Sequence, residues 1–164
     1  GCVTLLLTMM NLPDTVADEL YFVFTAQEEV GLRGAGTAAF AIEPDIAIAV
    51  DVTDTGDLPE HKYPMDCYLG KGPAVKVMDH SVLCTPKIRS ALEEAGLLAA
   101  VPTQREIMQF GGTDTAALQR SRTGVPAGAV SIPTRYIHSP SEMCAVSDVE
   151  QAAALLVQAV LHTL

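Results

Sequence analysis

The chain has 164 residues, enough for one domain with a substantial core, and 49% hydrophobic with 18% charged residues is a globular composition. Its formal net charge of −10 argues against a nucleic-acid partner, because contacts with phosphates require a basic surface. No apolar run approaches the ~20 residues that a membrane-spanning helix needs, so no membrane partner is predicted.

The amino-terminal part predicts one helix and one strand. Apolar spacing from residue 1 to residue 11 indicates a helix that Pro13 ends. The chain begins inside this apolar pattern without an initiator Met, so we interpret it as the carboxyl-terminal part of a longer protein, truncated at its amino terminus. Residues 20–26 form a short, continuous and aromatic apolar run, which predicts a buried strand.

The rest of the chain alternates predicted helices and strands. In chain order these are a helix ending near Ile42, a strand at 45–50, a polar cleft-lining loop from Thr53 to Pro64, strands at 65–69 and 73–78, a helix from Pro86 to Gly96, a strand at 103–108, a short helix ending near Ser121, a strand at 127–132 and a final helix. Ser147 is expected to cap that last helix, with Glu150 completing a capping box.

This alternation predicts an α/β fold. Helices that connect strands cover both faces of a mostly parallel sheet, so we expect a three-layer α/β/α sandwich in one domain over residues 1–164. The four cysteines, at positions 2, 67, 84 and 144, form no C-x-x-C pair, which favours free thiols over disulfides or a zinc knot. With no signal peptide in the sequence, this predicts a cytoplasmic protein.

Reactive side chains follow the ends of three predicted strands. Glu28 and Glu29 follow the first strand. Asp51 ends the second, and His138 lies in the loop after the last. Because ligands gather beyond the carboxyl ends of parallel strands, we expect these four side chains to share one pocket. Glu, Asp and His are ligands of hydrolytic metal centres, and the adjacent carboxylates leave one free to move a proton.

Each of these residues also has a plainer interpretation. An isolated Glu pair is often a solvated acidic loop, Asp51 could cap a helix or pair with an Arg, and a loop His is often a hydrogen-bonded surface residue. The turn from Gly111 to Asp114 is equally open. Its glycines could expose backbone amides to a substrate, with Gly112 and Thr113 as substrate-binding residues, or it could simply begin a helix.

An ordered set of motifs resembles the M42 family of metallo-aminopeptidases, the tetrahedral or glutamyl aminopeptidases. The segment from Thr25 to Gly34 resembles that family's glutamate motif. The other matching segments, which extend the resemblance over nearly the whole chain, are Ala49–Thr53, Pro59–Lys62, Leu69–Pro73, Gly111–Asp114 and Arg135–Ser139. The resemblance implies a zinc-dependent exopeptidase fold, peptide substrates and, for the full-length protein, a homo-oligomeric dodecamer.

The resemblance also implies a role for each candidate residue. Glu28 would be the general base, Glu29 a ligand of one metal with His138, and Asp51 a ligand of the other. The family uses two divalent ions, zinc or cobalt, which share a bridging water. A further His, a bridging Asp just upstream of a Gly-Cys pair, and an inserted assembly domain would all precede Gly1. The resemblance therefore predicts an inactive fragment that binds metal weakly.

Two other functions remain open from the sequence. The chain could be a non-catalytic homologue or binding module that keeps the same sheet. It could also belong to a related zinc exopeptidase or deacylase, such as a carboxypeptidase or an amidohydrolase. A glycosidase needs two carboxylates but not an Asp and a His at neighbouring strand ends, so it is the weaker interpretation.

Overall fold

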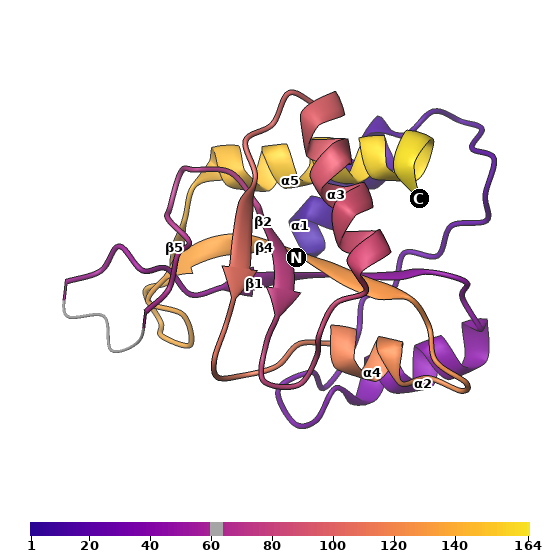
Figure 1. The fold of residues 1–164 in the computed structure, drawn as a ribbon, viewed down its shortest axis with the longest axis horizontal. Coiled ribbons are helices and arrows are strands. Elements are labelled where there is room, and N and C mark those ends of the chain that lie inside the picture. The colour runs from indigo at the N-terminus through magenta and orange to yellow at the C-terminus, as the bar shows by residue number, and fades with distance from the viewer. Residues whose placement is uncertain (60–63) are drawn as a thin grey trace.

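A sheet lies between two groups of helices in the computed structural model, which describes residues 1–59 and 64–164 (Figure 1). Its strands, in spatial order, are β1 (Ala47–Thr53), β4 (Ala127–Arg135), β2 (Ala74–Met78) and β3 (Gln104–Ile107), and the short β5 (Met143–Cys144) pairs with the end of β4. The pairs β1–β4 and β2–β3 are parallel, whereas β2 and β5 each run antiparallel to β4.

The helices form the two outer layers. One layer holds α1 (Cys2–Asn11), α3 (Pro86–Leu98), α5 (Val146–Gln158) and the terminal π-helix η1 (Ala159–Thr163), and the other holds α2 (Arg33–Ile42) and α4 (Thr115–Gln119) (Figure 1). Helix α5 packs against α1 and α3, and α2 packs against α4. The predicted α/β sandwich is confirmed.

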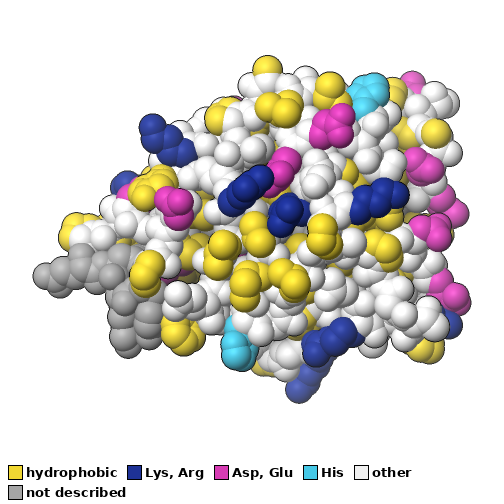
Figure 2. Space-filling model, in the orientation of Figure 1, with side chains coloured by type: hydrophobic (Ala, Val, Ile, Leu, Met, Phe, Trp, Pro, Cys, Tyr) yellow, Lys and Arg dark blue, Asp and Glu magenta, His cyan; other side chains and the backbone are white. Residues whose placement is uncertain are grey.

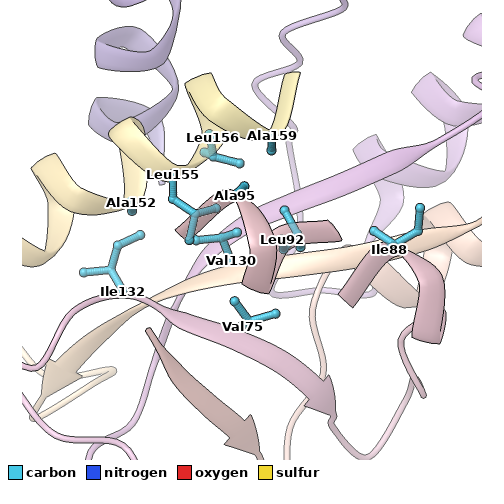
Figure 3. Close-up of a cluster of buried hydrophobic side chains, with 10 residues drawn as sticks. All are labelled: Val75, Ile88, Leu92, Ala95, Val130, Ile132, Ala152, Leu155, Leu156 and Ala159. Carbon is cyan, nitrogen blue, oxygen red and sulfur yellow. The ribbon is translucent and has the colours of Figure 1, made fainter. Parts of the chain in front are cut away.

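The main core lies between the sheet and helices α3 and α5. Figure 3 shows Leu92 and Leu155 projecting from these helices toward Val75 and Val130 on the sheet. Burying each leucine contributes about 1.5–3 kcal/mol. Gly128 permits the close approach of α3, because a Cβ at this position would lie 2.8 Å from a methyl carbon of Ile88. This packing holds β1 and β4 side by side, with their carboxyl ends at one edge.

The predicted strand at 20–26 is wrong. No ladder hydrogen bonds form there, and the stretch from Glu19 to Thr25 lines a cavity of about 290 Å³ whose other walls include β1. Its side chains Tyr21, Val23 and Phe24 are exposed. Apolar and aromatic side chains favour a half-buried, extended segment. A strand also needs a neighbouring strand that forms hydrogen bonds with its backbone N–H and C=O groups.

The predicted strand at 65–69 is also wrong, because side chains bind its backbone. The amide of Tyr68 donates to the side chain of Gln104 at 2.8 Å, and the amide of Leu69 donates to Asp57 at 3.1 Å. These contacts replace a strand ladder. The predicted loop before it spans residues that are only partly described, and Glu60, His61 and Lys62 of the predicted motif lie outside the described residues.

The predicted capping box of the last helix is wrong. Helix α5 begins at Val146, so Ser147 lies inside its first turn and accepts no capping bond from a backbone amide. Asp148 is the polar residue used instead. Its buried carboxylate accepts the amides of Gly70 and Gly72 at 2.8 and 3.0 Å, which ties a loop to the helix. A carboxylate in the first turn is also favoured by the helix dipole.

Two further features of the fold are its mixed surface and its free thiols. Figure 2 shows acidic, basic and hydrophobic side chains interspersed on the face viewed in Figure 1. All four cysteines are free: Cys67 and Cys84 are buried, and Cys2 and Cys144 are exposed. Burial raises the pKa of Cys67 to about 12 and that of Cys84 to about 11. In the described ranges, no helix combines the length and apolarity of a membrane span.

Candidate functional site

The structure brings Glu29 and His138 together although 108 positions separate them in the sequence. Nδ1 of His138 lies 3.6 Å from Oε1 of Glu29, and the two side chains are 67% and 73% exposed. Glu29 lies in the turn before α2, and His138 lies in the loop after β4. An imidazole and a carboxylate at this separation on an open surface can approach a common ligand.

The turn that carries the glutamates folds back on the start of α2. The carbonyl of Glu28 accepts the amides of Gly31 and Leu32 at 3.0 and 2.9 Å, and the amide of Gly34 donates to the carbonyl of Ala26 at 2.9 Å. A Cβ at residue 34 would lie only 2.5 Å from the Ala26 nitrogen. Glycine at position 34 therefore allows the tight turn that carries both glutamates.

Glu28 lies in an acidic environment. Burial, followed by the charges of Asp51, Glu29 and Asp114, raises the pKa of Glu28 to about 7, and the nearby His138 acts in the opposite direction. The charges of Asp51, Glu29 and His138 therefore all act on Glu28. A metal pocket shared by these four residues stays a prediction.

Asp51 at the end of β1 is more enclosed. Burial raises its pKa, while the hydrogen bond that it accepts from the Val52 amide at 2.8 Å lowers it. Gly1 is packed against the same strand, since a Cβ there would lie 2.5 Å from the carbonyl oxygen of Val50. The first residue of the chain thus lies beside Asp51.

Asp114 is a member of this acidic group that the sequence analysis did not select. Its Oδ2 accepts a hydrogen bond from Thr25 at 2.6 Å, which joins the glutamate segment to the turn before α4. Its Oδ1 is buried without a hydrogen-bond partner. It stands at the amino-terminal cap of α4, yet its side chain makes no capping bond. The sequence carries no signal for this role, because the absence of the capping bond is visible only in the structure.

Gly112 and Thr113 lie in the same turn, where Thr113 is buried and Gly112 is exposed. The Thr113 hydroxyl is buried and lies 3.2 Å from Asp79 and 2.9 Å from the hydroxyl of Thr115. A Cβ at Gly112 would lie 2.6 Å from the Ser81 hydroxyl. A substrate-binding role for Gly112 and Thr113 stays a prediction, restricted to the backbone of this turn.

The ligand atoms of this site are of the types that suit zinc or cobalt, but there are too few of them. Carboxylate oxygen and imidazole nitrogen are ligands of both metals. However, within residues 1–59 and 64–164 no three His, Cys, Asp or Glu side chains stand close enough to hold an ion. Glu29, Asp51 and His138 are therefore an incomplete ligand set as they stand.

A forked ion pair anchors the base of the His138 loop. Nε and a terminal nitrogen of Arg135 donate to the two carboxylate oxygens of Asp57 at 3.0 and 2.9 Å. Arg135 ends β4, and Asp57 also accepts the amide of Leu69. The pair therefore connects the end of the central strand to the loop that follows β1.

Replacing Asp57 with Asn should lower the free energy of unfolding by about 1 kcal/mol at pH 7, because the pair is only partly shielded from solvent. Arg135 holds the pKa of Asp57 well below its usual value. Its contribution is therefore complete above the unfolded pKa of about 4 and is lost as the pH falls through the lower folded pKa. Urea unfolding of both proteins at pH 7 and pH 3 measures this, with Asp18→Asn on an exposed segment as the control. An equal difference at both pH values would contradict it.

Comparison with known proteins gives a consistent family. The model of the M42 glutamyl aminopeptidase family matches residues 1–155. A protein of Acetivibrio thermocellus is 52% identical over 160 residues, which are 98% of this chain and 48% of that protein. An aminopeptidase from the archaeon Desulfurococcus kamchatkensis has a similar structure, with a TM-score of 0.94 at 36% identity over 99% of this chain and 46% of that one.

A third similar structure is the TET1 peptidase of Pyrococcus horikoshii, described as able to assemble into a tetrahedron or a large octahedral shell. Its TM-score is 0.70 at 30% identity, over 85% of this chain and 40% of that one. The chain thus spans about half the length of the curated relatives that it matches. Because the family model covers nearly all of it, the chain belongs to the M42 family of glutamyl aminopeptidases.

Proposed function

We propose that this chain is part of a metal-dependent aminopeptidase that removes amino-terminal residues from peptides. The observation that carries the proposal is the approach of His138 to Glu29, 3.6 Å apart, beside Glu28 and Asp51. Family membership supports the reaction type, since relatives of the chain are named aminopeptidases. A structural role alone would not require an imidazole and a carboxylate to converge on an exposed sheet edge.

Each residue has a distinct task in this proposal. Glu29 and His138 hold one divalent ion and Asp51 holds the other, with zinc or cobalt as the metal. Such ions, when bound, polarise the scissile carbonyl and lower the pKa of water. Glu28 takes the proton of the attacking water and passes it to the leaving amine. Glu29 is engaged as a ligand, so its neighbour Glu28 is the carboxylate that remains free to move the proton.

The missing ligands would come from outside these 164 residues. Gly1 lies against β1 beside Asp51, so a residue before Gly1 in a longer chain would lie next to the carboxylate group. We place the bridging Asp of the family resemblance there. A second carboxylate is needed at this point because two divalent ions close together repel each other strongly.

The chain alone should bind zinc weakly. Glu29 and His138 form a two-residue site, and two ligands leave a zinc ion with half of its usual coordination by protein. Isothermal titration of zinc into the purified chain should show at most one weak site, and Glu29→Gln should abolish it. Tight binding of two ions would contradict the incomplete ligand set.

Activity of the full-length protein separates this function from its alternatives. We expect hydrolysis of aminoacyl-p-nitroanilides in the presence of zinc or cobalt and no hydrolysis of N-acyl amino acids. The reverse preference would indicate a deacylase or carboxypeptidase on the same fold. A folded, metal-loaded protein that cleaves neither class would be a non-catalytic homologue or binding module.

The proposal extends to assembly and location. The full-length protein forms a homo-oligomer, a dodecamer as the family resemblance implies, and the assembly described for the TET1 peptidase supports this. Its substrates are short peptides, and no nucleic acid or membrane takes part. The four free cysteines support a reducing, cytoplasmic environment.

A further inference from the structure

The loop that carries His138 has an unfavourable backbone. The antiparallel pairing of β4 with β5 closes the loop, through Arg135 opposite Met143. Inside it, Tyr136 and His138 have φ angles of 58° and 60°. Both are in the left-handed region, which residues with a Cβ adopt only when the surrounding contacts stabilise it. A flexible loop would leave this conformation, and the imidazole would then lose its fixed position.

One side chain stabilises the strained residue directly. The backbone amide of His138 donates to Oε1 of Glu142 at 2.7 Å. An amide that donates to an ionised carboxylate makes one of the stronger hydrogen bonds in proteins. Inside the loop, the amide of Ser139 donates to the carbonyl of Tyr136 at 3.1 Å and the amide of Ser141 donates to the hydroxyl of Ser139 at 3.2 Å, so neither bond involves the His138 amide. Glu142 is therefore the group that holds the His138 backbone.

The direction of the imidazole depends on that backbone. A side chain leaves the chain along the Cα–Cβ bond, so a change of φ at His138 would swing the ring away from Glu29. With the present backbone, Nδ1 lies 3.6 Å from Glu29. Glu142 is exposed and, within the described part of the chain, bonds only to the His138 amide, so its removal does not disturb the core. A position of this kind affects the arrangement of the site rather than the stability of the fold.

We propose that Glu142 is a positioning residue for the metal centre: its carboxylate fixes the left-handed backbone of His138 and so directs the imidazole at the ion shared with Glu29. This inference rests on the proposed function, because it takes His138 as a metal ligand. Groups that orient a ligand typically change metal affinity by 10–100-fold when they are removed. Glu142 acts through the backbone, so we expect the lower end of this range.

Three variants of the full-length protein test the role of Glu142. Glu142→Ala removes the acceptor, Glu142→Gln keeps an acceptor oxygen without the charge, and Glu94→Ala, at an exposed position on α3, is the matched control. Each protein is titrated with cobalt, whose visible absorption reports the geometry of its ligands. kcat and KM are measured on the loaded proteins, and the melting temperature of the metal-free proteins monitors folding.

We expect Glu142→Ala to lower cobalt affinity about tenfold and to change the cobalt spectrum, with an unchanged melting temperature. Glu142→Gln should lose less than Glu142→Ala in both readouts, since its amide oxygen accepts the same bond but without the charge. The loss in Glu142→Ala should fall on kcat rather than KM. Wild-type affinity and spectrum in Glu142→Ala would overturn the inference, as would equal damage in Glu142→Gln, which would assign the effect to charge.

The same experiment tests the positioning role of Glu142 separately from the proposed metal centre. Wild-type protein that binds two ions and cleaves peptides, together with an unaffected Glu142→Ala, removes only the positioning role. Wild-type protein that binds no cobalt removes the proposed metal centre and the positioning role with it.

Discussion

Replacing Glu28 with Gln in the full-length protein is expected to lower turnover by a factor of about 10²–10⁴ while leaving the bound metal in place. Gln has nearly the same size and shape as Glu but cannot accept the proton of the attacking water. Glu28 is also beside the ligand pair rather than in it, since His138 pairs with Glu29. The effect should therefore appear in kcat and not in metal content.

The measurement combines kinetics on an aminoacyl-p-nitroanilide with elemental analysis of the purified protein. Glu94→Gln makes the same chemical change at an exposed position on α3 and should behave as the wild type. Turnover within about tenfold of the wild type would show that Glu28 is not the base. Loss of metal together with activity would instead make Glu28 a ligand, and the assignment of the two neighbouring glutamates would have to be exchanged.

The arrival of Asp51 and the His138 loop at one edge of the sheet could be predicted because it follows from strand direction. Strands β1 and β4 are parallel and in register, with Asp51 opposite Ser131, so the segments after both strands reach the same edge. A sequence states where an apolar run stops and which polar residues follow it. For parallel strands this is enough to bring distant residues to one place, whatever the exact length of each element.

The failed strand predictions depend on information that a local pattern does not contain. Residues 20–26 are as apolar as any buried strand, but pairing requires a second strand alongside, and among the described residues they have none. At 65–69 the deciding partners are the side chains of Gln104 and Asp57, which lie far away or in another loop. A long-range partner decides both cases, so propensity alone could not.

The acidic group around Asp114 shows the same limit at the site. A carboxylate before a helix is usually a cap, and the sequence offered no reason to choose otherwise. The structure assigns it to Thr25 because helix α4 lies beside the glutamate turn in space. The partners of Lys76 could not be predicted either. A lysine within an apolar strand gives no indication of the residues that it contacts. In the structure one of them, Glu106, lies directly opposite Lys76 on the neighbouring strand β3.

Replacing Lys76 with Met should destabilise the chain by about 3–5 kcal/mol, because it leaves two buried carboxylates without their cation. Lys76, Glu106 and Asp79 are 0%, 0% and 2% exposed. The ammonium of Lys76 contacts Glu106 and lies 3.4 Å from Asp79. Lys76 contacts one carboxylate oxygen of Glu106, and the other oxygen is buried without a hydrogen-bond partner. The attraction to Lys76 is therefore the main compensation for burying this carboxylate.

Urea unfolding of the purified chain measures this change, with Lys87→Met at an exposed position on α3 as the control. The double variant Lys76→Met with Glu106→Leu should recover part of the loss, because it removes one of the stranded carboxylates. Asp79 limits the recovery. Its carboxylate also binds Ser81 and Thr113, and so holds the turn that carries Asp114 beside Glu28. A loss below about 1 kcal/mol in Lys76→Met would show that the buried carboxylates are stabilised by other groups, and that this ion group does not support the site.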